Sequence, residues 1–218
     1  MSSFWYLDGF GILSEHNHKT FCRQTLIGGN YGLLNTTTFE PNPDYYALLL
    51  WQRLMGINVF NVNVSIENYN RQKDKEVSSY LRAYAHCTNT GSNNNAVIGK
   101  QEPGLTILLI NLSNETEFFI NISDYMYHER IEYVMDSTDL HSQSVYLNNK
   151  LLKTNALNGD IPNMDGKVVK PLKTIINGAR NSLNDNDVIK TATDNLIHLK
   201  PSSYGFFTFP TLDVEHCQ

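Results

Sequence analysis

The hydrophobic pattern of this chain changes at Gly56, and this change limits what the chain folds into. Before Gly56, the spacing of apolar residues predicts a helix over about Ser2–Ser14, a strand over Lys19–Ile27 and a helix over Tyr45–Met55. After it, short β-type runs replace the helical periodicity. A parallel strand needs neighbours that cover both of its faces. Residues 1–56 are therefore expected to be the closing piece of a larger α/β structure.

The second predicted helix carries signals at both ends. Asn42 is a candidate N-cap, Pro43 suits the first helical position, and Asp44 complements the positive end of the helix dipole. Gly56 is expected to close this helix as the glycine that follows the C-cap. The first helix has no such signals, and its two glycines are expected to fray or interrupt it.

Seven short runs rich in Val, Ile, Tyr and Phe follow Gly56, and polar turns separate them. The runs are Asn58–Val64, Ser78–His86, Leu105–Leu112, Glu117–Ile122, Ile131–Asp136, Ser144–Leu147 and Tyr204–Phe209. Their number and spacing predict an antiparallel β-sandwich over residues 57–218. The polar stretch around residues 155–200 indicates a long loop with one or two short strands, for which Val168–Val169 is a candidate.

The length and composition exclude several classes of protein. A (β/α)8 barrel alone takes about 250 residues, so 218 residues leave no room for a complete barrel and a second domain. The net charge is −5 and no basic cluster stands out, which argues against a nucleic-acid partner. Apart from the pair His16 and His18, the histidines show no metal-ligand spacing, and no phosphate loop or nucleotide fingerprint occurs. We therefore expect no metal and no cofactor.

The beginning of the chain differs in character from its interior. Met1–Asp8 has no basic segment followed by a long apolar one, so no signal peptide is visible, and no apolar run approaches the ~20 residues of a transmembrane helix. The chain nevertheless contains 26 asparagines and five Asn-x-Ser/Thr sequons, some of which chance alone would produce. The candidate glycosylation sites are Asn35, Asn63, Asn111, Asn114 and Asn121. The contrast leads us to expect that upstream sequence is missing.

Three cysteines leave two interpretations open. If two of Cys22, Cys87 and Cys217 form a disulfide, one remains free. The alternative is three buried thiols in a reducing compartment. Cys217, next to the C-terminal residue, is in an unusual place for a residue that only packs.

Several runs of residues resemble glycoside hydrolase family 79, the heparanases and the plant heparanase-like β-glucuronidases. The resemblance is specific over residues 1–150 and closest to the plant-type members, and it is loose beyond. It rests on Phe4–Asp8, Cys22–Leu34, Pro41–Tyr46, Leu54–Gly56, Leu81–Thr90, Leu105–Leu112 and Ser144–Asn148, and more weakly on Tyr204–Phe209.

The resemblance implies a mainly β chain, with an antiparallel β-sandwich preceded by the last helix–strand–helix piece of a (β/α)8 barrel. Residues 1–56 would be the C-terminal remnant of the glycosidase barrel, and residues 57–218 the sandwich. Retaining glycosidases use two carboxylates about 5–5.5 Å apart, and in this family both lie upstream of the Phe4–Asp8 helix. Glu15, Glu40 and Asp44 match neither motif, so we expect no catalytic residue in this chain.

The resemblance also assigns roles to residues that are present. In the family, the glycine backbone and tyrosine hydroxyl of the loop matching Gly29, Asn30 and Tyr31 contact a sugar carboxylate; a tight turn with a packed aromatic ring is the alternative. Arg23 is either a cation near this site or one half of a salt bridge. The family pattern implies a disulfide between Cys87 and Cys217, which leaves Cys22 as a free and buried thiol.

Two functional hypotheses follow. In the first, the chain is the C-terminal part of a heparanase-like β-glucuronidase, inactive alone, whose partners are a glucuronic-acid-containing glycan and the missing N-terminal barrel portion. In the second, it is a standalone, non-catalytic glycan-binding or interaction module. The resemblance implies an extracellular or lysosomal/vacuolar location, with possible membrane association. Without barrel neighbours, an apolar face is expected to be exposed, made of Phe4, Trp5, Phe21, Tyr46, Leu49 and Leu50.

Overall fold

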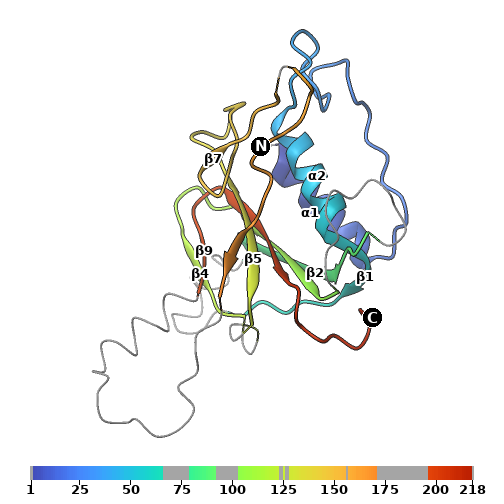
Figure 1. The fold of residues 1–218 in the computed structure, drawn as a ribbon, viewed down its shortest axis with the longest axis vertical. Coiled ribbons are helices and arrows are strands. Elements are labelled where there is room, and N and C mark those ends of the chain that lie inside the picture. The colour runs from blue at the N-terminus through green and yellow to red at the C-terminus, as the bar shows by residue number, and fades with distance from the viewer. Residues whose placement is uncertain are drawn as a thin grey trace, which may run out of the picture.

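The computed structural model of the chain describes residues 2–65, 79–91, 103–122, 125, 128–155, 157–170 and 196–217. This part is mainly β, with antiparallel sheets and two helices (Figure 1). The mainly β class predicted from the sequence is confirmed.

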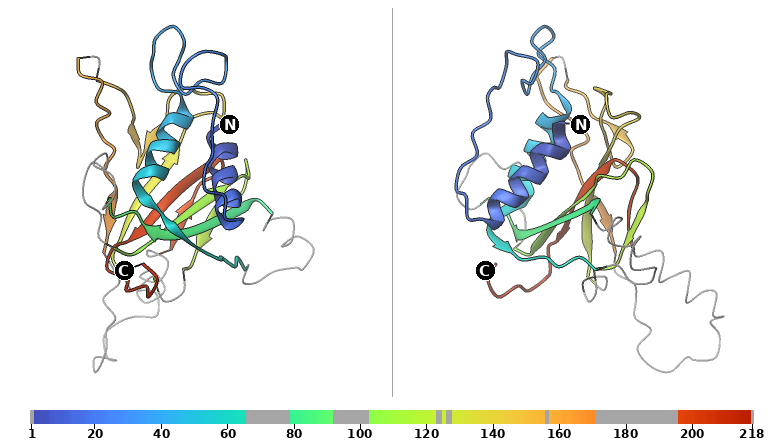
Figure 2. Two further views of the ribbon diagram at one scale, coloured as in Figure 1. Left: turned by 90° about the vertical axis from the view of Figure 1, so that its right-hand side faces the viewer. Right: turned by 180° about the vertical axis from the view of Figure 1, so that it is seen from behind.

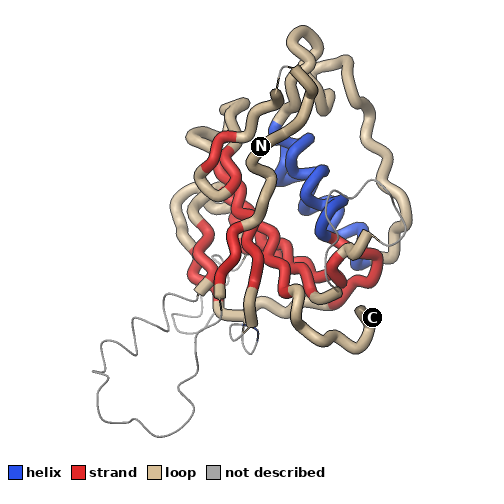
Figure 3. The backbone as a smooth tube through the Cα atoms, viewed as in Figure 1, coloured by secondary structure: helices blue, strands red, loops and turns tan. Residues whose placement is uncertain are grey.

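Both predicted helices form. Helix α1 spans Ser2–Glu15 and helix α2 spans Pro43–Leu54. They lie side by side on one flank of the main sheet (Figures 2 and 3). The two helices therefore form one layer over the strands.

Gly11 lies within α1 without interrupting it, contrary to the expectation that glycines would fray this helix. A Cβ atom at Gly11 would come within 2.4 Å of the ring of Tyr84. The hydroxyl of Tyr84 donates a hydrogen bond to the carboxylate of Asp8, one turn earlier in α1, at 2.6 Å. Glycine is needed here because the tyrosine ring lies directly against the helix backbone.

Helix α2 runs into strand β1 (Met55–Phe60) without a turn. Met55 has extended dihedral angles, φ −89° and ψ 116°. Gly56 follows the C-cap residue as predicted, but it continues into β1 and is not among the described glycines with positive φ. A Cβ atom on it would come within 2.5 Å of the carbonyl oxygen of Cys87. This glycine therefore permits a close approach between neighbouring strands.

One antiparallel sheet contains eight strands of the described residues. They are β1, β2 (Leu81–Thr88), β3 (Leu105–Asn111), β5 (Arg130–Asp136), β6 (Tyr146–Leu147), β7 (Lys150–Leu151), β8 (Lys167–Val169) and β10 (Ser203–Phe209). The spatial order is β1-β2-β3-β10-β5-β6-β7, and β8 also pairs with β5. A second sheet pairs β4 (Phe118–Ile120) with β9 (Ile197–Leu199).

Strands β3 and β10 form the centre of the main sheet. Every residue of both strands is buried. β10 pairs with β3 on one side and β5 on the other, so that Tyr204 lies opposite both Ile110 and Met135. Continuous apolar runs suit strands that are covered on both faces.

The helices cover one face of this sheet. Leu108 and Ile110 of β3 and Phe206 of β10 pack in one cluster with Leu50 and Leu54 of α2. All five side chains are at most 1% exposed. This cluster joins residues from both sides of Gly56 in one core.

The small sheet covers the opposite face. Ile107 and Leu109 of β3 and Phe207 of β10 pack with Ile197 and Leu199 of β9. The main sheet therefore lies between a helical layer and a two-stranded layer, and each face has its own apolar cluster.

The expectation of an exposed apolar face is wrong for its central residues. Tyr46 and Leu50 are 4% and 0% exposed, because the main sheet covers that face of α2. Phe4 and Leu49 are partly buried against the same cluster. Trp5, at 67% exposed, is the residue for which the prediction is confirmed.

The predicted strand Lys19–Ile27 does not form. The segment is extended, and its only bridge among the described residues is a parallel one between Ile27 and Leu34. An extended segment becomes a strand only when a neighbour accepts and donates its hydrogen bonds, and here the neighbouring strand is absent from the described part.

The predicted polar loop of residues 155–200 contains two of the strands. The candidate pair Val168–Val169 is confirmed as part of β8, and β9 agrees with the expected one or two strands, although no residues had been named for it. Residues 171–195, the middle of this stretch, lie outside the described residues.

Candidate functional site

The loop of residues 28–32 connects two segments that hold each other through the backbone. The amide of Leu33 donates to the carbonyl of Thr25 at 3.1 Å, and the amide of Leu34 donates to that of Leu26 at 2.9 Å. These bonds close the loop at its base and fix the direction in which it projects.

The glycines of this loop are required by its geometry. Gly28 and Gly29 have φ of +102° and +70°, a region that residues with a Cβ atom rarely occupy. A Cβ atom at Gly32 would lie 3.2 Å from the carbonyl oxygens of both Gly28 and Leu34. The Gly-Gly-x-x-Gly pattern is thus explained by backbone conformation and close approach.

The loop exposes hydrogen-bonding groups next to an aromatic ring. Tyr31 is 57% exposed, and its ring lies close to Gly29, within 3.5 Å of where a Cβ atom would stand. Among the described residues, no backbone carbonyl accepts the amides of Gly29 or Asn30. The structure therefore brings Gly29, Asn30 and Tyr31 together on one exposed turn.

Arg23 connects this loop to both helices. Its Nη2 donates to the carbonyl oxygen of Tyr31 at 2.7 Å and forms an ion pair with the carboxylate of Asp44 in the first turn of α2. Its guanidinium carbon lies 4.6 Å from the centre of the Tyr6 ring of α1. Of the two roles considered for Arg23, the structure shows the salt bridge.

The ion pair is shielded from water. The side chains of Arg23 and Asp44 are 9% and 2% exposed. Burial raises the pKa of Asp44, and the neighbouring Arg23 charge opposes that rise. Burial also raises the pKa of Tyr6. Among the described residues, Nη1 of Arg23 has no hydrogen-bond partner. Arg23 is thus engaged in structural contacts beneath the loop.

Asn42 is the N-cap of α2 by position, but its side chain caps nothing. Its Nδ2 instead donates to the carbonyl of Gly32 at 2.7 Å, and its amide donates to the carbonyl of Leu33 at 2.9 Å. The start of α2 is therefore tied to the glycine loop. Sequence reasoning missed this contact, and only the short separation of Gly32 from a polar N-cap could have suggested it.

The structure does not bring the other candidate carboxylates together. Asp44 is buried in its ion pair, whereas Glu15 ends α1 and Glu40 follows the loop, both exposed. Several further acids contact basic or phenolic groups. These pairs are Asp8 with Arg82 and Tyr84, Glu117 with His198, Glu132 with Arg130, and Asp136 with Lys200.

The C-terminal tail is joined to β2 by the disulfide that the resemblance implies. Cys87 and Cys217 are bonded, with their Cα atoms 5.2 Å apart. Cys22 is free as expected, but it is exposed and not the buried strand thiol that was predicted, because the segment around it forms no strand.

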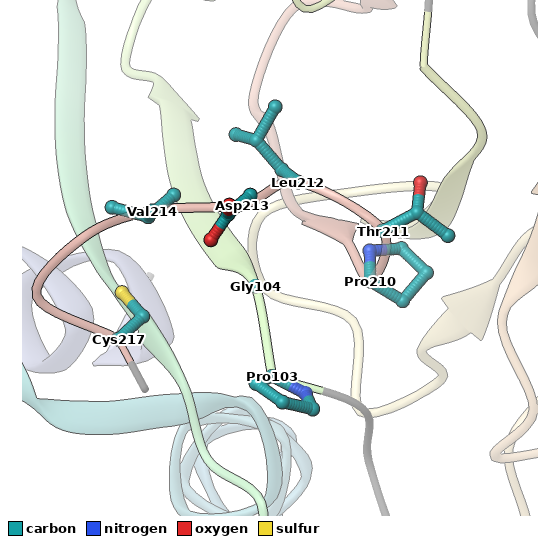
Figure 4. A pocket seen from close by; sticks show the side chains of 8 residues that line it. All are labelled: Pro103, Gly104, Pro210, Thr211, Leu212, Asp213, Val214 and Cys217. Carbon is teal, nitrogen blue, oxygen red and sulfur yellow. The ribbon is translucent and has the colours of Figure 1, made fainter.

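A cavity of about 230 Å³ lies beneath this tail (Figure 4). Figure 4 shows the labelled tail residues Leu212, Asp213, Val214 and Cys217 around Gly104, with Pro103 next to Gly104 and Pro210 next to Thr211. The lining offers few polar side chains.

The candidate glycosylation sites differ in accessibility. Asn63, Asn114 and Asn121 are exposed and Asn35 is half-buried. Asn111 is 0% exposed, and its Nδ2 donates to the carbonyls of Thr116 at 2.7 Å and Lys200 at 2.8 Å. A glycan on that nitrogen would have to displace these contacts, which favours a structural role for Asn111.

In the part of the chain that the structure describes, no group of three or more His, Cys, Asp or Glu side chains is placed to hold a metal ion. No described helix has the length and apolar character needed to cross a bilayer.

No family model matches the chain, but individual proteins do. The chain is 33% identical over 234 residues to heparanase-like protein 2 of Arabidopsis thaliana, an alignment that covers the whole chain and 38% of that protein. It is 38% identical over 156 residues to baicalin-beta-D-glucuronidase of Scutellaria baicalensis, covering 70% of the chain and 25% of the relative. It is 30% identical to hyaluronoglucuronidase of Hirudo nipponia, covering the whole chain and 37% of the relative.

The chain spans less than two fifths of the length of these curated relatives. The alignment with heparanase-like protein 2 extends over the whole chain, and so beyond residues 1–150, where the motif resemblance was specific. Two of the three relatives are named as glucuronidases. The chain therefore belongs to the heparanase-like family of glycan-acting hydrolases.

Proposed function

We propose that this chain is the C-terminal part of a heparanase-like β-glucuronidase and that its glycine loop receives the carboxylate of a glucuronic acid unit. In this proposal residues 1–56 are the last helix–strand–helix piece of the glycosidase barrel. Residues 57–218 form the attached β-sandwich. The parent protein would act on glucuronic-acid glycans outside the cell or in a lysosomal or vacuolar compartment.

The observation that carries the proposal is the exposed turn of Gly29, Asn30 and Tyr31. A carboxylate is recognised by donors that converge on its oxygens. Two left-handed glycines let a ligand approach the backbone amides closely, and the Tyr31 hydroxyl adds a side-chain donor beside them. Arg23 holds the Tyr31 carbonyl from below, which keeps the turn in place.

The chain alone is proposed to be catalytically silent. A retaining glycosidase needs an acid/base and a nucleophile, two carboxylates about 5–5.5 Å apart. The buried carboxylate of Asp44 is held by Arg23, and other acids contact the partners named above. We place both catalytic carboxylates in another segment of the parent protein, which would complete the barrel around the loop.

The test combines binding with turnover on the purified 218-residue chain. In ¹H–¹⁵N NMR spectra, D-glucuronate is expected to shift the resonances of residues 28–32, whereas D-glucose, which lacks the carboxylate, is not. The substitution Tyr31→Phe should weaken glucuronate binding about tenfold, because it removes a donor to a charged group. Tyr80→Phe, at another partly exposed tyrosine, is the matched control and should change nothing.

Turnover of 4-nitrophenyl β-D-glucuronide by the same sample should stay at the uncatalysed rate. Turnover that remains in the purified sample would refute the proposal that the chain alone is catalytically inactive. Glucuronate binding that is equal in Tyr31→Phe and the unsubstituted chain would refute the role of the loop.

A further inference from the structure

A larger cavity, of about 810 Å³, lies along the body of α2. It is bounded by α2 on one side and by β5, Asn155 and the segment of residues 159–166 on the other. Its volume falls within the roughly 300–1,000 Å³ typical of small-molecule sites. Its lining includes Tyr45, Leu49 and Arg53 of α2, and Met164, Asp160 and Asp165 of the facing segment.

Arg53 is the cation of this cavity. It lies in the last turn of α2 and is half-buried, and burial lowers the pKa of its guanidinium. No side-chain hydrogen bond or ion pair joins the guanidinium of Arg53 to another residue of the described ranges. A partly desolvated arginine ordinarily has a partner, and no described residue occupies these donors.

Acceptors stand across the cavity from this cation. Asp160 and Asp165 are exposed residues of the facing segment. The charge of Asp165 acts on Arg53 and favours its protonated form, yet the two groups form no ion pair within 4.0 Å. Asp160 Oδ2 accepts a hydrogen bond from Nδ2 of Asn158. Asp165 is therefore the acidic group of the lining that has no described hydrogen-bond donor.

The combination of one arginine and two carboxylates in this cavity favours some classes of ligand over others. A sugar hydroxyl donates and accepts at once, so neighbouring hydroxyls bridge an arginine and a carboxylate. A free anion would meet two aspartates in addition to Arg53. The apolar side chains of Leu49 and Met164, with the ring of Tyr45, supply a surface for the carbon face of a sugar ring.

We propose that the cavity beside α2 binds a neutral sugar unit, with Arg53 as donor and Asp165 as acceptor. The site is distinct from the glycine loop, which adjoins the N-terminal end of α2 through Asn42. It would give the chain a second contact with a glycan, one that recognises hydroxyls and not a carboxylate. The inference stands whether or not the loop binds glucuronate.

The experiment is saturation-transfer difference NMR on the purified chain with D-glucose, D-galactose, D-mannose and D-glucuronate as separate probes. At least one neutral sugar should receive saturation. Arg53→Leu should reduce its affinity about tenfold, because a hydrogen bond to a charged donor is lost. Asp165→Asn, an exposed substitution that leaves the helix untouched, should weaken it several-fold.

The controls separate this site from the loop. Tyr31→Phe should leave neutral-sugar binding unchanged, and circular dichroism should show that each variant keeps its fold. If Arg53→Leu unfolds, Asp165→Asn decides the question. The proposal is overturned if no neutral sugar binds, if both cavity variants bind as the unsubstituted chain does, or if glucuronate alone binds and depends on Arg53.

Discussion

Arg23 and Asp44 form a buried ion pair between the segment after α1 and the first turn of α2, with side chains 9% and 2% exposed. Breaking a buried pair by removing one partner leaves an uncompensated charge and destabilises by about 3–5 kcal/mol. The same pair lies beneath the glycine loop, since Arg23 also holds the Tyr31 carbonyl. Stability and loop position are therefore linked through one guanidinium.

Substituting Arg23→Gln should lower the free energy of unfolding by about 3–5 kcal/mol, because Asp44 is left buried without its counter-charge. Urea denaturation measures the change. The control is Lys200→Gln, which breaks an exposed pair with Asp136 and should cost about 0–1 kcal/mol. Equal effects from the two substitutions would contradict the buried pair.

Stability should fall below about pH 6.5 because of His86. Its ring is 3% exposed, Nδ1 bonds the Gly56 carbonyl at 2.7 Å, and burial lowers its pKa, so the fold holds the ring neutral. The unfolded chain takes up a proton near pH 6.5 and the folded chain does not. The stability that the neutral His86 ring contributes is fully present above about pH 6.5. It is lost as the pH falls from there towards the pKa of His86 in the folded chain, by up to about 1.4 kcal/mol per pH unit.

Melting temperatures of the unsubstituted chain and His86→Gln, measured from pH 8 to pH 5, test this expectation. The difference between the two proteins should shrink as the pH falls. A constant difference would show that His86 stays neutral in both states or becomes charged in both.

Two glycines of α1 should respond to alanine in opposite directions. Gly11→Ala places a Cβ atom 2.4 Å from the Tyr84 ring and should destabilise by about 1–3 kcal/mol. Gly9→Ala meets nothing within 4 Å and should stabilise by about 0.4–1 kcal/mol, since alanine favours the helix. Thermal unfolding shows whether each substitution raises or lowers stability. A higher melting temperature for Gly11→Ala would contradict the close contact between Gly11 and the Tyr84 ring.

Asn111 should carry no glycan when the chain is expressed in a glycosylating host, because its amide is buried and bonded to Thr116 and Lys200. Peptide mass spectrometry gives the occupancy. Asn111→Ala should cost about 1–3 kcal/mol, because it removes the acceptor of the buried Ser113 amide. Asn114→Ala, at the exposed sequon three residues later, should change stability by no more than about 0.5 kcal/mol.

The sequence predicted elements whose causes are local. Pro43 and Asp44 mark the start of α2, by the fixed backbone angle of proline and by an acidic charge in the first turn, and the apolar runs of β3 and β10 indicate buried strands. Each of these signals depends only on residues a few positions away in the sequence. They can therefore be recognised without knowledge of which distant segments pack together.

Features that depend on a distant partner were not predicted. Lys19–Ile27 has a strand pattern, but no neighbouring strand lies beside it in the described part. Gly56 has the form of a helix-ending glycine, yet the approach of Cys87 explains it. The partner of Arg23 was left open because the pairing with Asp44 requires two segments 21 positions apart to meet.

The direct passage from α2 into β1 has a mechanical consequence. With no turn between them, a displacement of the helix along its axis is transmitted to the edge strand of the sheet, since no residue there acts as a hinge. Proteolysis or truncation at Gly56 would not release two independent units, because Leu50 and Leu54 share their core with Leu108 and Ile110. The point where the sequence changes character therefore lies within one packed unit, in which α2 and the main sheet share a core.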